Sequence, residues 1–306
     1  MNTAAAHHPP PRPSRSELLG LQHQARRLRS MQRHQSHRNP GQRQTRRHGR
    51  GMDFQESRVY QPGDDCRHLD WRVTARTGVA HTKLYGEERQ RPLVLIIDAN
   101  ASLFFGTRVT FKSVIAARLA TLLGWMALQQ GDRVGAVFYA GDRQQWLPVQ
   151  AGRRGVMALI QGLLDWFAPD PLPMPQPSAG GLSAVLQRLD KGPTSSGLMI
   201  LISDFQHREP SLETHLARLR QRHDVSAYQI ADPLELTLPA PGRYPVSVGT
   251  QLRVLDWRQR RQRQAWQAQQ QAQQRQWAEL WHRHGIPWHT VTTEQQAEQV
   301  LIHPEP

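Results

Sequence analysis

The chain has 306 residues, of which 38% are hydrophobic, and it carries a formal net charge of +14 at pH 7. This length is enough for one large domain or two small ones, and the single cysteine, Cys66, excludes an internal disulfide. The sequence has no run of about 20 uncharged apolar residues and no apolar signal segment at its start, so we expect a cytoplasmic chain without a transmembrane helix.

The basic charge is concentrated at the N-terminus. Residues 1–50 contain eleven arginines, no lysine and one acid, Glu17, whereas the remaining 256 residues carry 28 basic and 24 acidic side chains. This composition predicts that residues 1–48 form a largely disordered basic tail, with one helical part from Glu17 to Met31. The tail can make weak, salt-dependent contact with an anionic surface. No aromatic residue precedes Phe54 to stack on bases, so no specific nucleic acid is expected.

Residues 49–90 follow the tail and are predicted to form a β-rich N-terminal extension. Arginines and aspartates alternate within it, and Gln61-Pro62-Gly63-Asp64 suits a type II turn. Bidentate Arg–carboxylate pairs would make this segment rigid. Two interpretations stay open, a network that straps the extension onto a sheet and a surface that binds a partner. Both use the same residues, which are Arg58, Tyr60, Asp64, Asp65, Arg67, Asp70, Trp71 and Arg76.

From residue 91 onward, apolar runs typical of buried strands alternate with amphipathic helices. The predicted strands are 92–98, 133–139, 144–149, 198–203, 225–230 and 286–291. The predicted helices are 110–130, 155–167, 181–189, 211–223, a Gln-rich helix at 255–284, and 294–302, with a proline-rich connection at 168–181. This alternation predicts an α/β fold with a doubly wound, mostly parallel sheet over residues 91–306.

Oxygen-bearing side chains follow two of the predicted strands. Asp98, Asn100 and Ser102 come directly after the first strand, and Asp204 follows the strand that ends at Ser203. Because parallel strands place their carboxyl ends at one edge, these side chains are expected to converge there. They form a possible, degenerate Mg²⁺ site. The alternative is that the two aspartates accept hydrogen bonds from loop N–H groups.

At these residues the chain resembles the von Willebrand factor A fold and its metal-ion-dependent adhesion site. That site has an Asp-x-Ser-x-Ser sequence, a later Gly-Gly-Thr and a further Asp. Asp98, Ser102 and Asp204 match it, and Asn100 replaces the first serine. The threonine is absent, because this chain has Gly180-Gly181-Leu182 with Ser183 next. The resemblance implies a metal site that has lost ligands.

Residues 58–76 read Arg-Val-Tyr-Gln-Pro-Gly-Asp-Asp-Cys-Arg-His-Leu-Asp-Trp-Arg-Val-Thr-Ala-Arg. This segment, with Lys112 in the first helix, Gly131–Gly135 and Asp232-Pro233 before Glu235, resembles the bacterial domain-of-unknown-function-58 family over residues 45–300. The resemblance implies an adaptor that links a MoxR-type AAA+ ATPase to a client protein complex.

The leading hypothesis is therefore a non-enzymatic protein-interaction adaptor that works with a MoxR-type AAA+ ATPase. Its metal-site edge would bind the partner either through a bound Mg²⁺ or through polar loops alone. A nucleic-acid-associated protein acting through the Arg-rich tail is the alternative. A metal-dependent hydrolase using Asp98 and Asp204 is disfavoured, because the sequence shows no nucleophile with a recognisable base and no third acidic ligand.

Overall fold

The computed structural model describes residues 12–38, 52–61, 64–87, 91–168, 181–192, 196–237, 240–248 and 251–302. The chain divides into two compact units. We call the unit formed by Met1–Gln35 and Arg91–Pro306 the α/β unit, and the unit formed by Ser36–Gln90 the hairpin unit. The predicted turn at residues 62 and 63 and most of the proline-rich connection lie outside the described residues.

The described part of the α/β unit is built on a six-stranded sheet with the order β10-β7-β6-β3-β4-β5. Neighbouring strands pair in parallel, except that β5 returns antiparallel beside β4. The strands are β3 (Pro92–Asp98), β4 (Arg133–Ala140), β5 (Arg143–Gln150), β6 (Leu198–Ser203), β7 (Asp224–Ala231) and β10 (Trp288–Thr292). The predicted doubly wound, mostly parallel sheet is confirmed.

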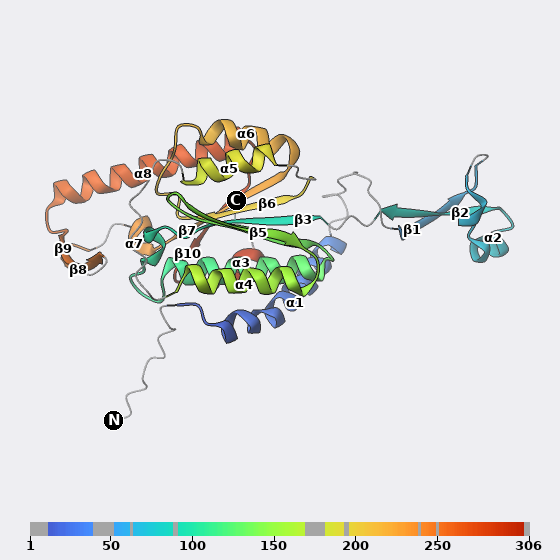
Figure 1. Cartoon of the computed structure of the whole chain (residues 1–306), viewed down its shortest axis with the longest axis horizontal. Helices are drawn as coiled ribbons and strands as arrows, with labels where there is room; N and C mark the ends of the chain where they lie inside the picture. The colour runs from blue at the N-terminus through green and yellow to red at the C-terminus, as the bar shows by residue number, and fades with distance from the viewer. Residues whose placement is uncertain are drawn as a thin grey trace, which may run out of the picture. The chain divides into compact units, whose positions relative to one another are not determined.

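Helices cover both faces of this sheet (Figure 1). One face packs against α1 (Arg15–Arg38), α3 (Lys112–Gln129), α4 (Arg153–Trp166) and α9 (Ala297–Ile302). The opposite face packs against α5 (Gly181–Lys191), α6 (Leu212–Arg222) and α8 (Arg260–Arg283). Side chains of β3 alternate between the two cores, with Leu95 on the α3 side and Ile96 on the α8 side. Both faces are therefore buried, as the continuous apolar strands predict.

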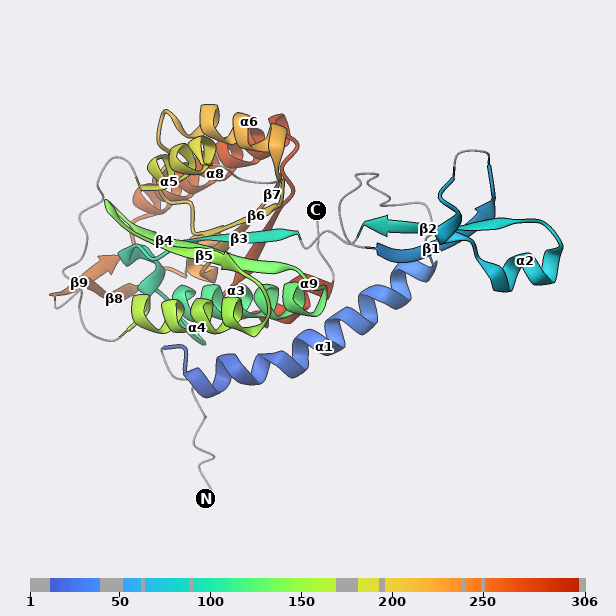
Figure 2. The same ribbon diagram turned by 45° about the vertical axis from the view of Figure 1, so that its right-hand side comes forward.

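Helix α1 packs its apolar side onto this unit (Figure 2). Its buried residues are Leu18, Leu21, Ala25 and Leu28. The indole N–H of Trp125 donates to the carbonyl oxygen of Leu18 at 3.2 Å, and Arg118 pairs with Glu17 at 2.5 Å. A helix was predicted here, but as part of a separate tail. The prediction of a separate tail was wrong for this helix, because its apolar stripe is long enough to bury against α3.

The segment after β7 differs most from the prediction. The short helix α7 (Pro233–Leu236) leads into an antiparallel pair, β8 (Arg243–Val248) and β9 (Gln251–Asp256). No element was predicted between residues 231 and 254, yet a two-stranded pair tolerates proline because its outer edges need no partner. Helix α8 consequently begins at Arg260, five residues later than predicted. Helix α6 begins at Leu212, one residue later than predicted, and the side chain of the preceding Ser211 makes no capping hydrogen bond.

The hairpin unit consists of β1 (Met52–Val59) paired antiparallel with β2 (His81–Glu87). A 3₁₀ turn (Cys66–His68) and the helix α2 (Trp71–Thr77) lie between the two strands in the sequence. The carboxylate of Asp70 begins α2 by accepting hydrogen bonds from the N–H groups of Arg72 and Val73. Gly78, with φ of 72°, ends it in the left-handed conformation that glycine adopts without strain.

Candidate functional site at the carboxyl edge of the sheet

The carboxyl ends of β3 and β6 lie where the direction of strand order reverses. From β3 the chain passes through α3 on one face to β4, whereas β6 lies on the other side of β3 and is followed by α6 on the opposite face. Such a reversal creates a crevice in which open α/β sheets bind ligands. Asp98 ends β3, and Asp204 comes directly after β6. The structure thus places both predicted aspartates at this crevice.

Asp98 is buried and accepts hydrogen bonds on both carboxylate oxygens. Oδ1 accepts from the backbone N–H of Asn100 at 2.8 Å and from its side-chain Nδ2 at 2.7 Å. Oδ2 accepts from the hydroxyl of Ser203 at 2.6 Å, and Ser203 immediately precedes Asp204. Burial, together with the nearby charge of Asp204, raises the pKa of Asp98 to about 6 despite these hydrogen bonds. The two aspartates therefore interact across the β3–β6 boundary.

Asp98 should make the stability of the protein depend on pH. Because its pKa is higher in the folded chain than its ordinary value, the folded state holds the proton more tightly. The protonated carboxyl of Asp98 therefore stabilises the folded state. This contribution to the free energy of unfolding is full below about pH 4 and is lost as the pH rises through about 6. The variant Asp98→Asn has no carboxyl at this position, so it lacks the pH-dependent contribution to stability. Denaturant unfolding across this range should show the variant gaining stability relative to wild type as the pH rises, and a constant difference would contradict the assignment.

Lys112 joins Asp204 to a third acid. Its Nζ donates to Asp204 Oδ2 at 2.8 Å and to Glu235 Oε1 at 2.8 Å. The side chain of Lys112 is only 1% exposed, although it belongs to the first residue of α3. Burial acts to lower the pKa of Lys112, but the charges of Asp204 and Glu235 outweigh it and raise that pKa. The ammonium group therefore stays protonated and links α3, β6 and α7.

Asp232 organises the neighbouring loops. Its carboxylate accepts hydrogen bonds from the N–H and hydroxyl of Thr107, the hydroxyl of Thr293 and the N–H of Leu234. With Glu235, whose side chain accepts from the Asp232 N–H, it forms a capping box at the start of α7. Burial acts to raise the pKa of Asp232, but these hydrogen bonds outweigh it and lower that pKa. Glu235 is held in place for Lys112 by this box.

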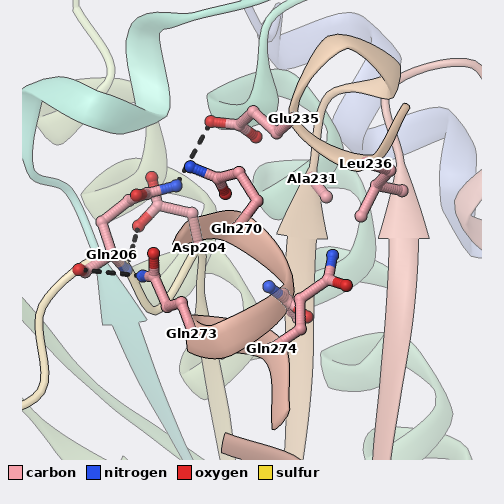
Figure 3. A pocket seen from close by; sticks show the side chains of 9 residues that line it. Asp204, Gln206, Ala231, Glu235, Leu236, Gln270, Gln273 and Gln274 are labelled. Atoms are coloured by element: carbon pink, nitrogen blue, oxygen red, sulfur yellow. Dashed lines mark hydrogen bonds between the residues drawn. The ribbon is translucent and has the colours of Figure 1, made fainter. Parts of the chain in front are cut away.

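A shallow, amide-rich pocket opens beside this cluster (Figure 3). Gln206 donates to Glu235 through its side-chain amide, at 3.3 Å. Gln273 of α8 donates to the carbonyl oxygens of Phe205 and Gln206. The pocket, about 310 Å³ including space open to solvent, is lined by Asp204, Gln206, Gln229, Ala231, Glu235, Leu236, Gln270, Gln273 and Gln274. Glutamines of the Gln-rich helix α8 thus cover part of the carboxyl edge.

Phe205 fixes the connection between β6 and α8. It is buried and has a φ of 52°, a conformation that is unfavourable for a bulky side chain. Its ring contacts Trp277 and Trp281 with centroid distances of 5.0 and 5.2 Å. Its carbonyl oxygen accepts from the indole N–H of Trp277 at 2.8 Å. These contacts hold the residue that directly follows Asp204.

Three of the predicted metal ligands, Asp98, Asn100 and Asp204, are already engaged with other groups. Asn100 turns its amide oxygen to the N–H of Gly141 at 3.0 Å and its amide nitrogen to Asp98. Asp204 accepts from Lys112, and Ser102 lies in the 3₁₀ turn Ala101–Phe104 just beyond Asn100. Mg²⁺ needs a nearly octahedral set of oxygen ligands.

One oxygen near the edge has no partner. The hydroxyl of Ser183, beside the position where the resemblance implies a threonine, is buried without a hydrogen bond among the described residues. Its N–H and that of Leu182 donate to the carboxylate of Glu209. This spare hydroxyl does not offset the hydrogen bonds that Asp98 and Asp204 already accept. As they lie in this structure, the residues do not fit Mg²⁺, and metal binding stays a prediction.

The predicted Arg–Asp network of the hairpin unit consists of local contacts. Arg58 pairs with Asp64 at 2.7 Å, and the hydroxyl of Tyr60 donates to the carbonyl oxygen of Asp64 at 3.3 Å. Arg67 pairs with Asp65 in a bidentate contact, but its side chain is 88% exposed. Such exposed pairs contribute little stability.

The remaining predicted residues of this unit have different roles. Asp70 caps α2 and accepts from the hydroxyl of Ser57 at 2.6 Å. Trp71, at the start of α2, is 71% exposed. Arg72 and Arg76 lie on the same exposed side of α2, and neither makes an ion pair with the part of the chain that the structure describes. This side of the unit is open to a partner.

Lys112 and Glu235 are the functional residues that reasoning from the residues did not assign. Both were noted only as part of the family resemblance. Lys112 could have been found as a cation in the first turn of an apolar helix, where it opposes the helix dipole. Glu235 could have been found from the Asp232-Pro-Leu-Glu235 capping-box pattern. Lys112 pairs with Asp204, 92 residues away in the sequence, and with Glu235, 123 residues away, so these contacts could be found only from the fold.

The strand order and the helices on both faces define a doubly wound α/β protein. The chain matches the model of the family described as "Protein of unknown function DUF58" over residues 56–276 and belongs to that family. None of the helices that the structure describes has an apolar stretch suited to spanning a bilayer.

The chain is similar to curated relatives and to solved structures. The uncharacterized protein Mb1516 of Mycobacterium bovis is 32% identical over 197 residues, 63% of this chain and 59% of that protein. The uncharacterized protein Rv1480 of Mycobacterium tuberculosis matches to the same extent, so the chain spans about 59% of these relatives' length. BatB from Bacteroides thetaiotaomicron has a TM-score of 0.43 at 14% identity, covering 69% of this chain and 95% of that one. A von Willebrand factor type A protein from Catenulispora acidiphila has a TM-score of 0.34 at 13% identity, covering 73% and 42%.

Proposed function

We propose that the protein is a non-enzymatic interaction adaptor whose carboxyl edge binds a partner protein. The observation that carries this proposal is the position of exposed apolar side chains. Phe104 (39% exposed) and Val109 (44%) lie between β3 and α3, and Leu236 (38%) lies in α7 after β7. These loops leave the carboxyl ends of their strands, where α/β proteins bind ligands. Exposed apolar side chains at this ligand-binding edge support a protein interface there.

The arrangement of the polar residues favours binding over catalysis. Ser203, the hydroxyl nearest to Asp98, is buried, donates to that carboxylate and accepts from the N–H of Phe205. Lys112 is equally buried and neutralises the acids beside it. A nucleophile or general base must reach the substrate. Groups that are buried and already hydrogen-bonded to one another hold the edge in shape instead.

The proposed partner is a MoxR-type AAA+ ATPase, with a client complex as the second partner. Membership of the DUF58 family supports this choice, because the family resemblance implies such an adaptor. Partner binding through exposed loops on a rigid sheet suits an adaptor, since the sheet fixes the loop positions.

The proposal is tested with the purified full chain and a MoxR-type ATPase from the same genome. Binding is measured by biolayer interferometry with ATP, with ADP and without nucleotide. Val109→Ser and Leu236→Ser should weaken binding, whereas Val254→Ser, which changes an equally exposed valine on β9, should not. No binding in any nucleotide state, or equal binding by all three variants, would contradict the proposal.

The hairpin unit offers a second contact surface for the same partner. An exposed tryptophan beside Arg72 and Arg76 has the composition of a binding hot spot. Trp71→Ala is expected to weaken ATPase binding by more than about 10-fold while changing the free energy of unfolding by less than about 0.5 kcal/mol. Interferometry and urea unfolding check the two expectations. His68→Ala, which changes a half-buried side chain of the 3₁₀ turn before α2, is the control.

A further inference from the structure

Lys112 occupies a position that helix stability does not explain. It is the first residue of α3, where a positive charge opposes the helix dipole. It is also fully buried, which penalises a charged amine strongly unless the amine is paired. Both effects act against a lysine here, so a compensating interaction must outweigh them. That interaction is the contact with Asp204 and Glu235 at 2.8 Å each.

The two aspartates of the edge are satisfied in different ways. Among the described residues, Asp98 accepts from uncharged donors such as the Asn100 amide groups and the hydroxyl of Ser203. Asp204 accepts from a full positive charge. A site that binds a divalent ion leaves such carboxylate oxygens available to the ion. In this protein the charge comes from the chain itself.

We propose that the Lys112 ammonium supplies the positive charge that Mg²⁺ would supply at this edge, so that the edge binds its partner without a metal ion. Lys112 holds Asp204 and Glu235 in fixed positions and thereby aligns the ends of β6 and α7. The acidic partner side chain that would complete a metal's coordination is not required. Partner recognition then depends on the apolar and amide side chains around the cluster, such as Leu236 and Gln206.

A buried ion pair that only supports the fold is the competing explanation. It differs in what happens when Lys112 is removed. If the ammonium stands in for a cation, its loss leaves two carboxylates, Asp204 and Glu235, in a place that a divalent ion can enter. If the contact is only structural, added metal has no effect on such a variant.

The test compares the full chain with Lys112→Ala by isothermal titration calorimetry and thermal unfolding in MgCl₂ and in MnCl₂. The wild type should bind neither ion at this edge and should melt at the same temperature with EDTA. Lys112→Ala should gain saturable Mg²⁺ binding. Its melting temperature should rise by at least about 2 °C in millimolar MgCl₂. Lys112→Arg, which keeps the charge, should show no response. Lys112→Ala/Asp204→Asn should lose the response.

A second variant covers the case in which Lys112→Ala does not fold. Lys112→Gln removes the positive charge, keeps a side chain of similar size and leaves both carboxylates in place, so it should also gain Mg²⁺ binding. Mg²⁺ binding by the wild type that is lost in Asp98→Asn overturns the proposal, and so does a folded variant of either kind without a Mg²⁺ response. The inference rests on the proposed function for its consequence, but these titrations use the isolated chain. Their failure is thus distinct from a failure to bind the ATPase.

Discussion

Replacing Lys112 by methionine is expected to lower the free energy of unfolding by roughly 3–5 kcal/mol. Methionine keeps the length of the side chain and removes its charge, so Asp204 and Glu235 lose their shared partner. Asp204 is buried, and the side chain of Glu235 is only 20% exposed, so water replaces the lost contact poorly. Urea unfolding at pH 7 followed by circular dichroism gives the difference from wild type.

The control for this prediction breaks an ion pair of the same length at the surface. Arg91 and Asp224 lie 2.8 Å apart, with side chains 50% and 54% exposed. Arg91→Met should cost less than about 1 kcal/mol, because exposed pairs contribute little. Similar decreases in the free energy of unfolding for Lys112→Met and Arg91→Met would mean that burial does not determine how much the Lys112 ion pairs contribute to stability.

Replacing Leu18 by alanine is expected to lower the free energy of unfolding by about 2–5 kcal/mol. Leu18 lies in α1 and is completely buried in the core formed with α3, where its carbonyl oxygen also accepts from Trp125. The substitution leaves a cavity in a core that cannot fully collapse around it. Urea unfolding of the full chain measures the loss.

The matched control lies on the exposed side of the same helix. Arg26 and Arg27 are exposed, so Arg26→Ala/Arg27→Ala should change the stability by no more than about 0.5 kcal/mol. The same double variant should bind the ATPase as the wild type does. A stability loss from the arginine variant equal to that from Leu18→Ala would show that α1 is not held by its apolar side.

The strands of the sheet were predictable because their sequences are apolar without interruption. The run from Pro92 to Asp98 and that from Leu198 to Ser203 can bury both faces only between two helical layers. The convergence of Asp98 and Asp204 followed from parallel pairing alone. The β8–β9 pair was not predictable, since Pro245 and nearby turn residues are as typical of a loop as of an isolated hairpin.

Other features required contacts between distant parts of the chain. The arginine-rich composition around α1 predicted disorder, although four buried residues spaced along one side are enough to dock the helix. The role of Lys112 depends on acids 92 and 123 residues away, and no local pattern specifies such a pairing. Sequence periodicity gives the elements, and tertiary packing decides which side chains meet.

The left-handed backbone of Phe205 means that the geometry of Asp204 is imposed from outside its own strand. A bulky residue with φ of 52° carries a local cost of about 1–3 kcal/mol, which its surroundings must offset. Trp277 and Trp281 provide that compensation from α8, more than seventy residues further along the chain. The conformation of the residue next to Asp204 therefore depends on helix α8 as much as on the strand that Asp204 follows.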